Sequence, residues 1–294
     1  MARVPILKTY KMFINGQFPR TESGRYYTVS NKNKKVIANV CLASRKDFKN
    51  AVVAARNAQA GWASKTALNK SQIIYRLAEV LEGRKNQIIE ELVLQGITHS
   101  KANQEVITAI DRIIYYAGWA DKYTQVFSTV NPVASSHFNF SLPEPMGVVS
   151  LIAPNQPSFL GLISTMLPII VSGNTCVVLA SENYPLSAVT FAEILATSDF
   201  PTGVVNIITG TEKELIEYFA DHMDVNAIIY CRNSKDYKKK IQELSALNVK
   251  RTLFWDKYNW HKDNAQSPYL IMDTCETKTT WHPIENIGTS GTKY

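Results

Sequence analysis

Cysteine is scarce in this sequence, and long apolar runs are missing. The four cysteines lie far apart, form no Cys-x-x-Cys pair and have no histidine at metal-ligand spacing: Cys41, Cys176, Cys231 and Cys275. This usage is typical of a reducing compartment and predicts no disulfide framework. Residues 1–8 are too short an apolar stretch for a signal peptide, and no run approaches the length of a membrane span. We therefore expect a cytoplasmic protein with no membrane partner.

Several motifs that carry chemistry are missing as well. The sequence contains no Gly-x-Gly-x-x-Gly fingerprint, no Walker A loop, no Gly-x-Ser-x-Gly and no His-Glu-x-x-His. Its histidines are scattered and show no ligand spacing: His99, His137, His222, His261 and His282. The sequence therefore predicts no metal site.

The net charge of +7 at pH 7 raises the question of nucleic acid. The basic clusters at residues 32–35 and 238–240 are short, and neither is interleaved with aromatic residues. We interpret both clusters as solvated faces and expect no nucleic-acid partner.

Residues 44–122 have helical periodicity. Ser44-Arg-Lys-Asp47 is typical of a capping box, and apolar residues follow it on one helical face. Two further helices are expected, one from about Lys70 and one from about Ala102 to Lys122, each with an apolar stripe. These stripes indicate packing faces.

The pattern changes after residue 147. Five short apolar runs recur, separated by stretches long enough for crossover helices: Val148–Ala153, Thr175–Leu179, Val204–Ile208, Ala227–Cys231 and Arg251–Trp255. Apolar strands that alternate with helices predict a doubly wound α/β fold with a parallel sheet covered on both faces. Thr211-Glu-Lys-Glu214 is a capping-box pattern that opens one of the crossover helices.

Other segments are typical of strands outside this sheet. They are Lys11–Gly16 and Tyr26–Val29 near the N-terminus, the alternating run His137–Leu142, and Tyr269–Met272 and Lys278–His282 near the C-terminus.

Four segments of the second half carry recognisable motifs. They read P-M-G-V-V at 145–149, I-A-P-N-Q-P at 152–157, S-G-N-T-C-V-V-L at 172–179 and F-P-T-G-V-V-N-I-I-T-G at 200–210. In this order they resemble E-P-x-G-V-V, I-x-P-W-N-F-P, A-G-N-T-V-V-L and F-P-x-G-V-V-N-I-V-T-G of the aldehyde dehydrogenase superfamily. The likeness covers about residues 10–256, and the last segment is its most specific part.

The resemblance implies a catalytic pair that this sequence does not carry. In the family, a cysteine within G-Q-x-C attacks the aldehyde, and a glutamate within L-E-L-G-G is the base. Cys275 has none of those neighbours, and Phe254, which cannot accept a proton, stands at the base position. Asn155, or Gln156 if no gap is allowed, is the vestige of the family's oxyanion-stabilising asparagine. We therefore predict no catalytic residue.

The cofactor contacts implied by the resemblance, to NAD or NADP, are also altered. The glycine of the family's F-T-G-S turn lets backbone N–H groups at a helix start approach the pyrophosphate. Here Arg232 replaces that glycine and is expected to obstruct the approach. The family's K-P-S-E reads L-A-S-E at 179–182, without the lysine, and leaves Glu182 as a residual ribose contact. We expect no cofactor, and leave weak NAD or NADP binding through Glu182 open.

The resemblance also predicts how the chain is divided. Residues 1–123 and 148–263 are expected to form the Rossmann-like cofactor-type domain. Residues 124–147 form an oligomerisation hairpin, 264–283 a C-terminal oligomerisation strand, and 284–294 a flexible tail. The family's catalytic domain is expected to be absent, as in the non-catalytic second module of its two-domain branch.

Hairpin and strand together predict an antiparallel oligomerisation arm. The residues expected at its interface are Phe138, Phe140, Leu142, Leu270 and Met272. We predict a catalytically inactive structural or regulatory subunit, whose partner is a second copy in a homodimer or a full-length aldehyde dehydrogenase. Two alternatives stay open. One is an NAD(P)-dependent aldehyde oxidoreductase, divergent or completed by a partner chain, and the other is a nicotinamide-dinucleotide-binding sensor.

Overall fold

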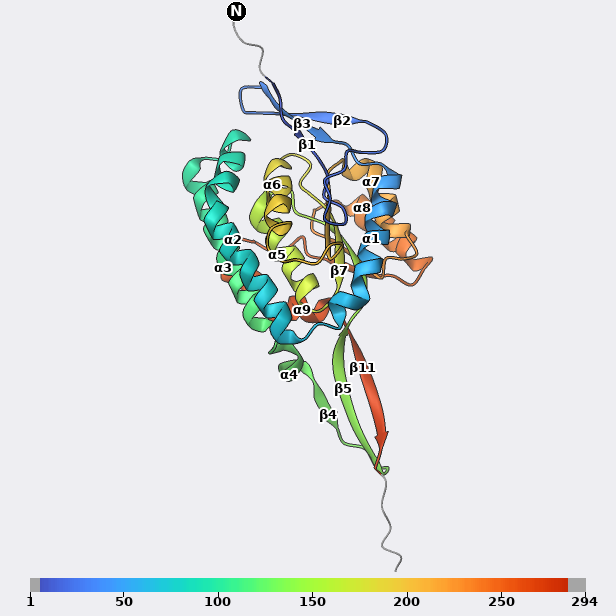
Figure 1. Ribbon diagram of the computed structural model, residues 1–294. Coiled ribbons are helices and arrows are strands. Elements are labelled where there is room, and N and C mark those ends of the chain that lie inside the picture. The colour runs from blue at the N-terminus through green and yellow to red at the C-terminus, as the bar shows by residue number, and fades with distance from the viewer. Residues whose placement is uncertain (1–5, 285–294) are drawn as a thin grey trace, which may run out of the picture.

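A five-stranded parallel sheet forms the centre of the structure, a computed structural model that describes residues 6–284 (Figure 1). The strand order is β10-β9-β6-β7-β8, and all neighbours run parallel. The strands are β6 (Val148–Ile152), β7 (Thr175–Leu179), β8 (Val205–Ile208), β9 (Ala227–Tyr230) and β10 (Arg251–Phe254). Every residue of the first four is buried, as expected for a sheet covered on both faces. The predicted doubly wound α/β fold is confirmed.

Helices cover the two faces of the sheet in separate groups. One face packs against α1 (Arg45–Ala63), α7 (Glu212–Asp221) and α8 (Lys235–Ala246). The other packs against α5 (Ser158–Val171) and α6 (Leu186–Leu195). Outside these two lie α2 (Ala67–Leu94) and α3 (His99–Trp119), which form an antiparallel pair (Figure 1). No described helix is both long and apolar enough to cross a membrane.

The two expected capping boxes differ in outcome. At α1 the box is present: Ser44 Oγ accepts from Asp47 N at 3.4 Å, and Asp47 Oδ2 accepts from Ser44 N at 2.7 Å. At α7 the expected box is wrong, because Thr211 makes no side-chain cap hydrogen bond and Glu214 instead binds Arg25. The first backbone N–H of α7, that of Glu212, instead donates to the carboxylate of Glu182 on the loop after β7.

A small sheet at the N-terminal end has the order β1-β3-β2, with β1 (Thr9–Tyr10), β2 (Tyr26–Ser30) and β3 (Val36–Cys41). The prediction of a strand at Lys11–Gly16 is wrong. That segment makes only isolated β-bridges, one of them between Phe13 and Ile207. The segment is attached to the rim of the large sheet instead of forming a strand.

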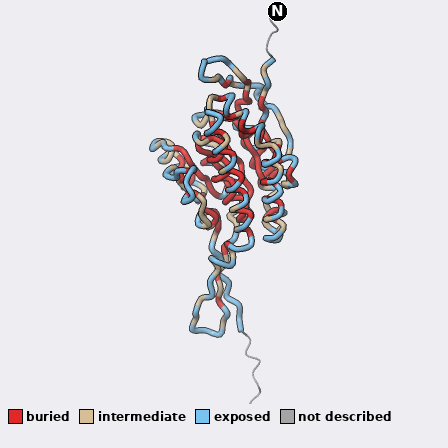
Figure 2. Tube along the Cα trace, turned by 90° about the vertical axis from the view of Figure 1, so that its left-hand side faces the viewer, coloured by how far each residue is buried: buried red, intermediate tan, exposed pale blue. Residues whose placement is uncertain are grey.

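A three-stranded antiparallel arm projects from the body (Figure 1). Its order is β11-β5-β4, with β4 (Thr129–Asn131), β5 (His137–Pro145) and β11 (Cys275–Pro283), and the short helix α4 (Tyr123–Phe127) leads into it. Figure 2 shows that residues of the arm are mostly exposed, whereas the middle of the body is buried. The arm joins segments that are far apart in the sequence.

One expected arm strand is a helix. Residues 269–272 lie in α9 (Pro268–Asp273), where Ser267 Oγ accepts from Tyr269 N at 3.2 Å and Pro268 occupies the first turn. Leu270 is 1% exposed and packs in the core of the body, so Leu270 and Met272 do not belong to an arm strand. Periodicity cannot distinguish a short apolar run in a strand from one in a helix, and the Ser-Pro start decides for the helix. The tail expected at 284–294 lies, after Ile284, outside the described residues.

Candidate functional site

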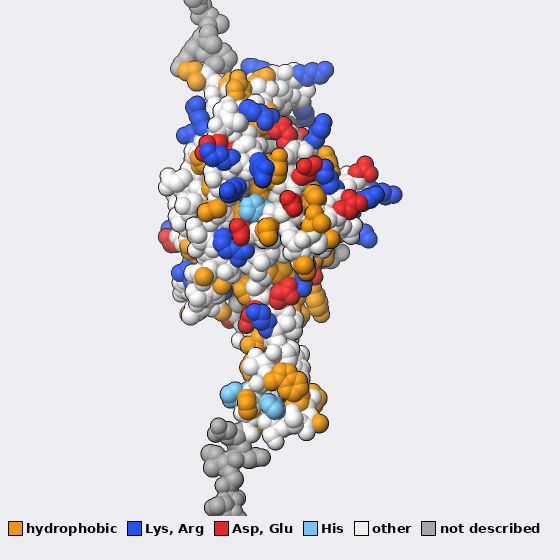
Figure 3. Space-filling model, turned by 90° about the vertical axis from the view of Figure 1, so that its right-hand side faces the viewer, with side chains coloured by type: hydrophobic (Ala, Val, Ile, Leu, Met, Phe, Trp, Pro, Cys, Tyr) orange, Lys and Arg blue, Asp and Glu red, His pale blue; other side chains and the backbone are white. Residues whose placement is uncertain are grey.

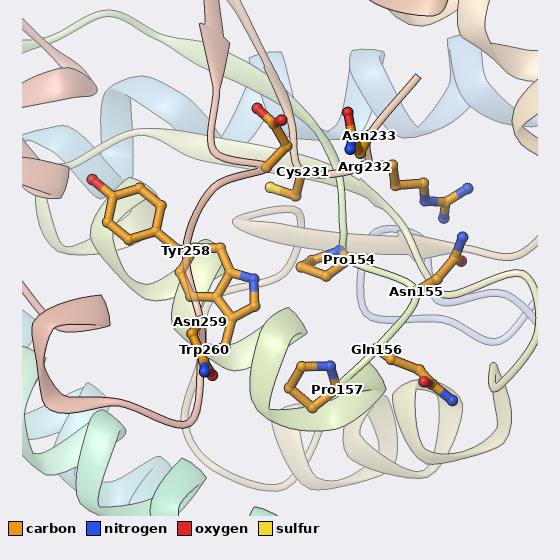
Figure 4. A pocket seen from close by; sticks show the side chains of 11 residues that line it. Pro154, Asn155, Gln156, Pro157, Cys231, Arg232, Asn233, Tyr258, Asn259 and Trp260 are labelled. Atoms are coloured by element: carbon orange, nitrogen blue, oxygen red, sulfur yellow. The ribbon is translucent and has the colours of Figure 1, made fainter. Parts of the chain in front are cut away.

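The carboxyl ends of the parallel strands are where ligands bind in doubly wound folds. From β6 the chain proceeds to β7 and β8 on one side and then crosses to β9 on the other, so the topological switch lies beside β6. A hollow of about 460 Å³ opens there (Figure 4). It is lined by loops that follow β6, β9 and β10: Pro154, Asn155, Gln156, Pro157, Cys231, Arg232, Asn233, Asp256, Tyr258, Asn259 and Trp260.

Arg232 crosses this end of the sheet instead of extending into solvent. It follows β9 and is only 6% exposed. Its Nε donates to the carbonyl oxygen of Ala153 at 3.0 Å, and its Nη2 donates to that of Ala180 at 3.0 Å. Because Ala153 and Ala180 directly follow β6 and β7, the guanidinium bridges the ends of two neighbouring strands.

Two glutamates neutralise the Arg232 charge. Arg232 Nη1 donates to Glu212 Oε2 at 3.1 Å, and Glu182 Oε2 lies 4.0 Å from the same nitrogen. Glu182 Oε2 also accepts from Glu212 N at 3.3 Å, so its carboxylate serves the N-terminus of α7. Tyr230 donates its hydroxyl to Glu212 Oε1 at 2.5 Å, and burial together with this hydrogen bond raises the pKa of Tyr230. We call Arg232, Glu212, Glu182 and Tyr230 the ion cluster.

Asn155 and Gln156 lie on the loop after β6. Asn155 Oδ1 accepts from Glu182 N at 3.2 Å, and its carbonyl oxygen accepts from Ser181 Oγ at 3.0 Å. Asn155 therefore ties together the loops after β6 and β7, and Gln156 is exposed. The vestigial role of Asn155 stays a prediction.

Phe254 ends β10 on the same side of the sheet. Its ring lies edge-on to the Tyr230 ring at 6.5 Å between centroids, and Lys238 Nζ lies 5.7 Å from its centre. Lys238 itself is paired with Asp256 at 2.6 Å. The position that the resemblance assigns to the base is thus occupied by a phenyl ring, which packs against Tyr230 and cannot accept a proton.

Cys231 beside the hollow and Cys275 at the amino end of the sheet are both poorly suited to nucleophilic attack. Cys231 borders the hollow but is buried, and burial raises the pKa of its thiol. Cys275 starts β11, is buried as well, and burial raises its pKa to about 12. Since the thiolate is the nucleophile, both groups are inert thiols near neutral pH. Within residues 6–284 no cluster of three or more His, Cys, Asp or Glu side chains could hold a metal ion.

A short segment after β10, residues 255–267, covers the body beside the hollow; we call it the strap. Trp255 and Trp260 are each 3% exposed and belong to the core. Arg112 of α3 donates through Nη2 to the carbonyl oxygens of Trp260 at 3.2 Å and Lys262 at 3.4 Å. The strap leads through η1 (Asp263–Ala265) to α9 and the arm, so the described chain has no second α/β domain between β10 and β11.

Sequence reasoning found Arg232, Glu182, Asn155 and Phe254 through motif positions, and the fold brings all four to the carboxyl end of the sheet. The sequence did not identify Glu212, nor the hydrogen bonds by which Arg112 holds the strap. The acidic start of α7 was a visible signal for Glu212, but its partner comes from a separate loop. Arg112 lies among apolar residues of a helical stripe, and this placement was the available sign of a buried cation.

Comparisons with known proteins agree with this geometry. The model of the aldehyde dehydrogenase family matches residues 18–254. Omega-crystallin of Enteroctopus dofleini is 31% identical over 254 residues, which are 85% of this chain and 51% of that protein. Mitochondrial 10-formyltetrahydrofolate dehydrogenase of Homo sapiens is 27% identical over 273 residues, 91% of this chain and 29% of that protein. The NAD+ complex of an aldehyde dehydrogenase from Bacillus cereus superposes with a TM-score of 0.79 at 29% identity, covering 84% of this chain and 50% of that one.

Proposed function

The chain belongs to the aldehyde dehydrogenase family, and on this premise we propose that it is a catalytically silent member that acts as a structural or regulatory subunit through association. It spans about half the length of the omega-crystallin and of the Bacillus cereus enzyme that it matches. Silence is supported by Phe254 at the base position, by cysteines held as thiols, and by the strap where the family has a catalytic domain.

The arm is the observation that carries the proposal. Along β5, Phe138, Phe140 and Leu142 point to one face, and Asn139 and Ser141 point to the other. The rings of Phe138 and Phe140 are 5.5 Å apart between centroids. Figure 3 shows hydrophobic side chains and histidines gathered on the arm. The arm is therefore a two-faced sheet standing outside the body.

The two faces of the arm differ in hydrogen bonding and in exposure to water. On the polar face Asn131 Nδ2 donates to Asn139 Oδ1 at 2.6 Å, and the hydroxyls of Ser141 and Thr279 are hydrogen-bonded at 2.8 Å. On the apolar face Phe138 is 45% exposed and Val130 of β4 is 68% exposed. Most of these polar groups find partners within the arm, but Asn139 Nδ2 is buried without a hydrogen-bond partner. The apolar groups keep contact with water.

An arm of this kind exposes apolar side chains and an unpaired strand edge, and association can cover both. A partner sheet covers apolar area, and it can pair with the outer edge of β11, which no described strand covers. A stable complex buries about 800 Å² on each partner. A second copy of this chain and a full-length aldehyde dehydrogenase both present a suitable strand edge.

Light scattering on the purified chain tests the proposal. We expect a mass above the 33.0 kDa of one chain when the chain is alone, or, in a mixture with a purified full-length aldehyde dehydrogenase, a complex heavier than that enzyme measured by itself. Replacing both Val130 and Phe138 by serine should reduce the mass to that of one chain. Leu68→Ser, which changes a residue of α2 that is 67% exposed, is the matched control and should leave the mass unchanged. A 33.0 kDa species under both conditions contradicts the proposal.

A further inference from the structure

We infer that the ion cluster replaces the phosphates of a dinucleotide, so that the chain folds with its own ion pair where its relatives hold a cofactor. The inference rests on the family assignment and extends the catalytic silence proposed above, but it does not depend on association. It concerns Arg232, Glu212 and Glu182, all at the carboxyl end of the sheet.

The position of Arg232 supports this inference first. It stands where the resemblance places the glycine that lets a phosphate approach the start of the following helix, here α8 with Ser234 as N-cap. A glycine leaves that approach open, whereas the Arg232 side chain bridges the ends of β6 and β7. The space over the ends of β6 and β7 is therefore occupied by the Arg232 side chain.

Arg232 is not available as a phosphate ligand in its own right. Its Nε, Nη1 and Nη2 all donate to protein oxygens at 3.0–3.1 Å, and its side chain is 5% exposed. A phosphate would have to displace carbonyl oxygens and a carboxylate that are already in place. Replacing a buried, fully hydrogen-bonded ion pair is costly, because each released group must find a new partner.

The local charge also opposes an anion. Two carboxylates, Glu212 and Glu182, lie within 4.0 Å of a single guanidinium nitrogen, which leaves the cluster with one negative charge in excess. Glu182 already bonds the first N–H of α7, the kind of position at which helices bind anions. Glu182, the expected ribose contact, is thus engaged in the cluster instead of facing the hollow.

Opening the cluster tests the inference directly. Arg232→Gly combined with Glu212→Gln removes the bulk of the guanidinium together with one positive and one negative charge. The net charge of the cluster stays the same, so the titration tests whether the occupied space is what excludes a phosphate. Calorimetric titration with NAD and with NADP should give no saturable heat for the natural chain up to about 1 mM, and a dissociation constant near 0.1 mM or below for the double variant. This gain in affinity is at least tenfold.

The matched control is an exposed ion pair whose carboxylate, Glu214, lies on α7 as Glu212 does. Arg25 and Glu214 are paired at 2.8 Å with side chains 49% and 40% exposed, and the variant R25G/E214Q should behave as the natural chain does. If R232G/E212Q fails to fold by circular dichroism, R232A/E212Q serves instead, because it restricts the backbone more in the unfolded state.

Two outcomes overturn the inference: tight NAD binding by the natural chain, or a folded double variant that binds no dinucleotide. Light scattering on the same samples separates this result from the proposed function. The arm is not changed in these variants, so a failed titration with an unaltered mass refutes the ion-cluster inference and leaves the association proposal standing.

Discussion

Two buried cations, Arg232 and Lys250, are stabilised by different acceptors. Arg232 has a carboxylate partner, Glu212. Lys250 has none among its hydrogen-bond partners and donates to three carbonyl oxygens at the C-terminal end of α7, those of Phe219, Ala220 and His222. Cations are favoured at helix C-termini, but burial still lowers the pKa of Lys250 to about 8.

The lowered pKa of Lys250 predicts a pH dependence. In the unfolded chain the amine keeps its usual pKa of 10.5, so between about pH 8 and 10.5 the unfolded state holds a proton that the folded state has released. Lys250 therefore contributes a rise in stability, and in the urea midpoint, between pH 7 and pH 9. The buried thiols of Cys176, Cys231 and Cys275, whose pKa is raised, contribute a fall over the same range.

Substitution of Lys250 tests whether this residue contributes the rise in urea midpoint with pH. Lys250→Met should reduce the rise in midpoint, and Lys239→Met, at a site 78% exposed, should preserve it. Lys70, whose pKa is also lowered by burial, accounts for the part that remains. Equal rises in the two variants would show that Lys250 does not carry the effect.

At the residue scale, the sequence was sufficient wherever a residue stands inside a motif. Arg232 and Phe254 were identified because their neighbours fix the register against the family pattern. The pairing of Arg232 with Glu212 and Glu182 was not, since Glu212 starts α7 and Glu182 lies on the loop after β7, and only the folded sheet brings them together. Arg112 was missed for the same reason: its acceptors belong to the strap.

Among the elements, the strap is what closes the body after β10. Its anchor is Trp260, buried beside α3 and held at its carbonyl oxygen by Arg112. Trp260→Ala removes a large buried side chain and should cost about 3–5 kcal/mol of unfolding free energy, measured by urea denaturation. Tyr258→Ala, at a site 36% exposed, is the control and should cost clearly less.

Trp260→Ala also tests whether the strap is fixed to the body by Trp260. Trp260→Ala should also speed proteolytic cleavage between residues 256 and 264, because local opening exposes that backbone. Similar unfolding free energies for the two variants, with unchanged cleavage, would show that the strap contributes little to the fold.

Element prediction succeeded where the pattern was long or fully apolar. The five strands of the central sheet were placed to within a residue, because buried parallel strands are continuous apolar runs. It failed at residues 269–272, a run too short for its period to be read. It also omitted β3, whose six residues are only partly buried. Boundaries of α2 and α3 shifted by three residues, as N-caps Thr66 and Thr98 precede the apolar stripes.

At the scale of the whole molecule, the body and the arm have different properties. The carboxyl end of the sheet is occupied by the ion cluster and flanked by the strap, both held by buried hydrogen bonds. The arm pairs most of its own polar groups, with the exception of Asn139 Nδ2, and leaves an apolar face and, among the described residues, a strand edge open. Strand ends bridged by Arg232, together with an open arm, are what we expect of the association subunit proposed above.

Turnover by the purified chain is the most direct test of this account. We expect no reduction of NAD or NADP above a no-protein control with a panel of aliphatic and aromatic aldehydes. Cys231 and Cys275 are buried thiols whose pKa is raised, Phe254 stands at the expected position of the base, and Arg232 is fully paired. Nicotinamide absorbance during prolonged incubation at high protein concentration measures this. Activity that survives repurification and is abolished by Cys231→Ser would contradict the account.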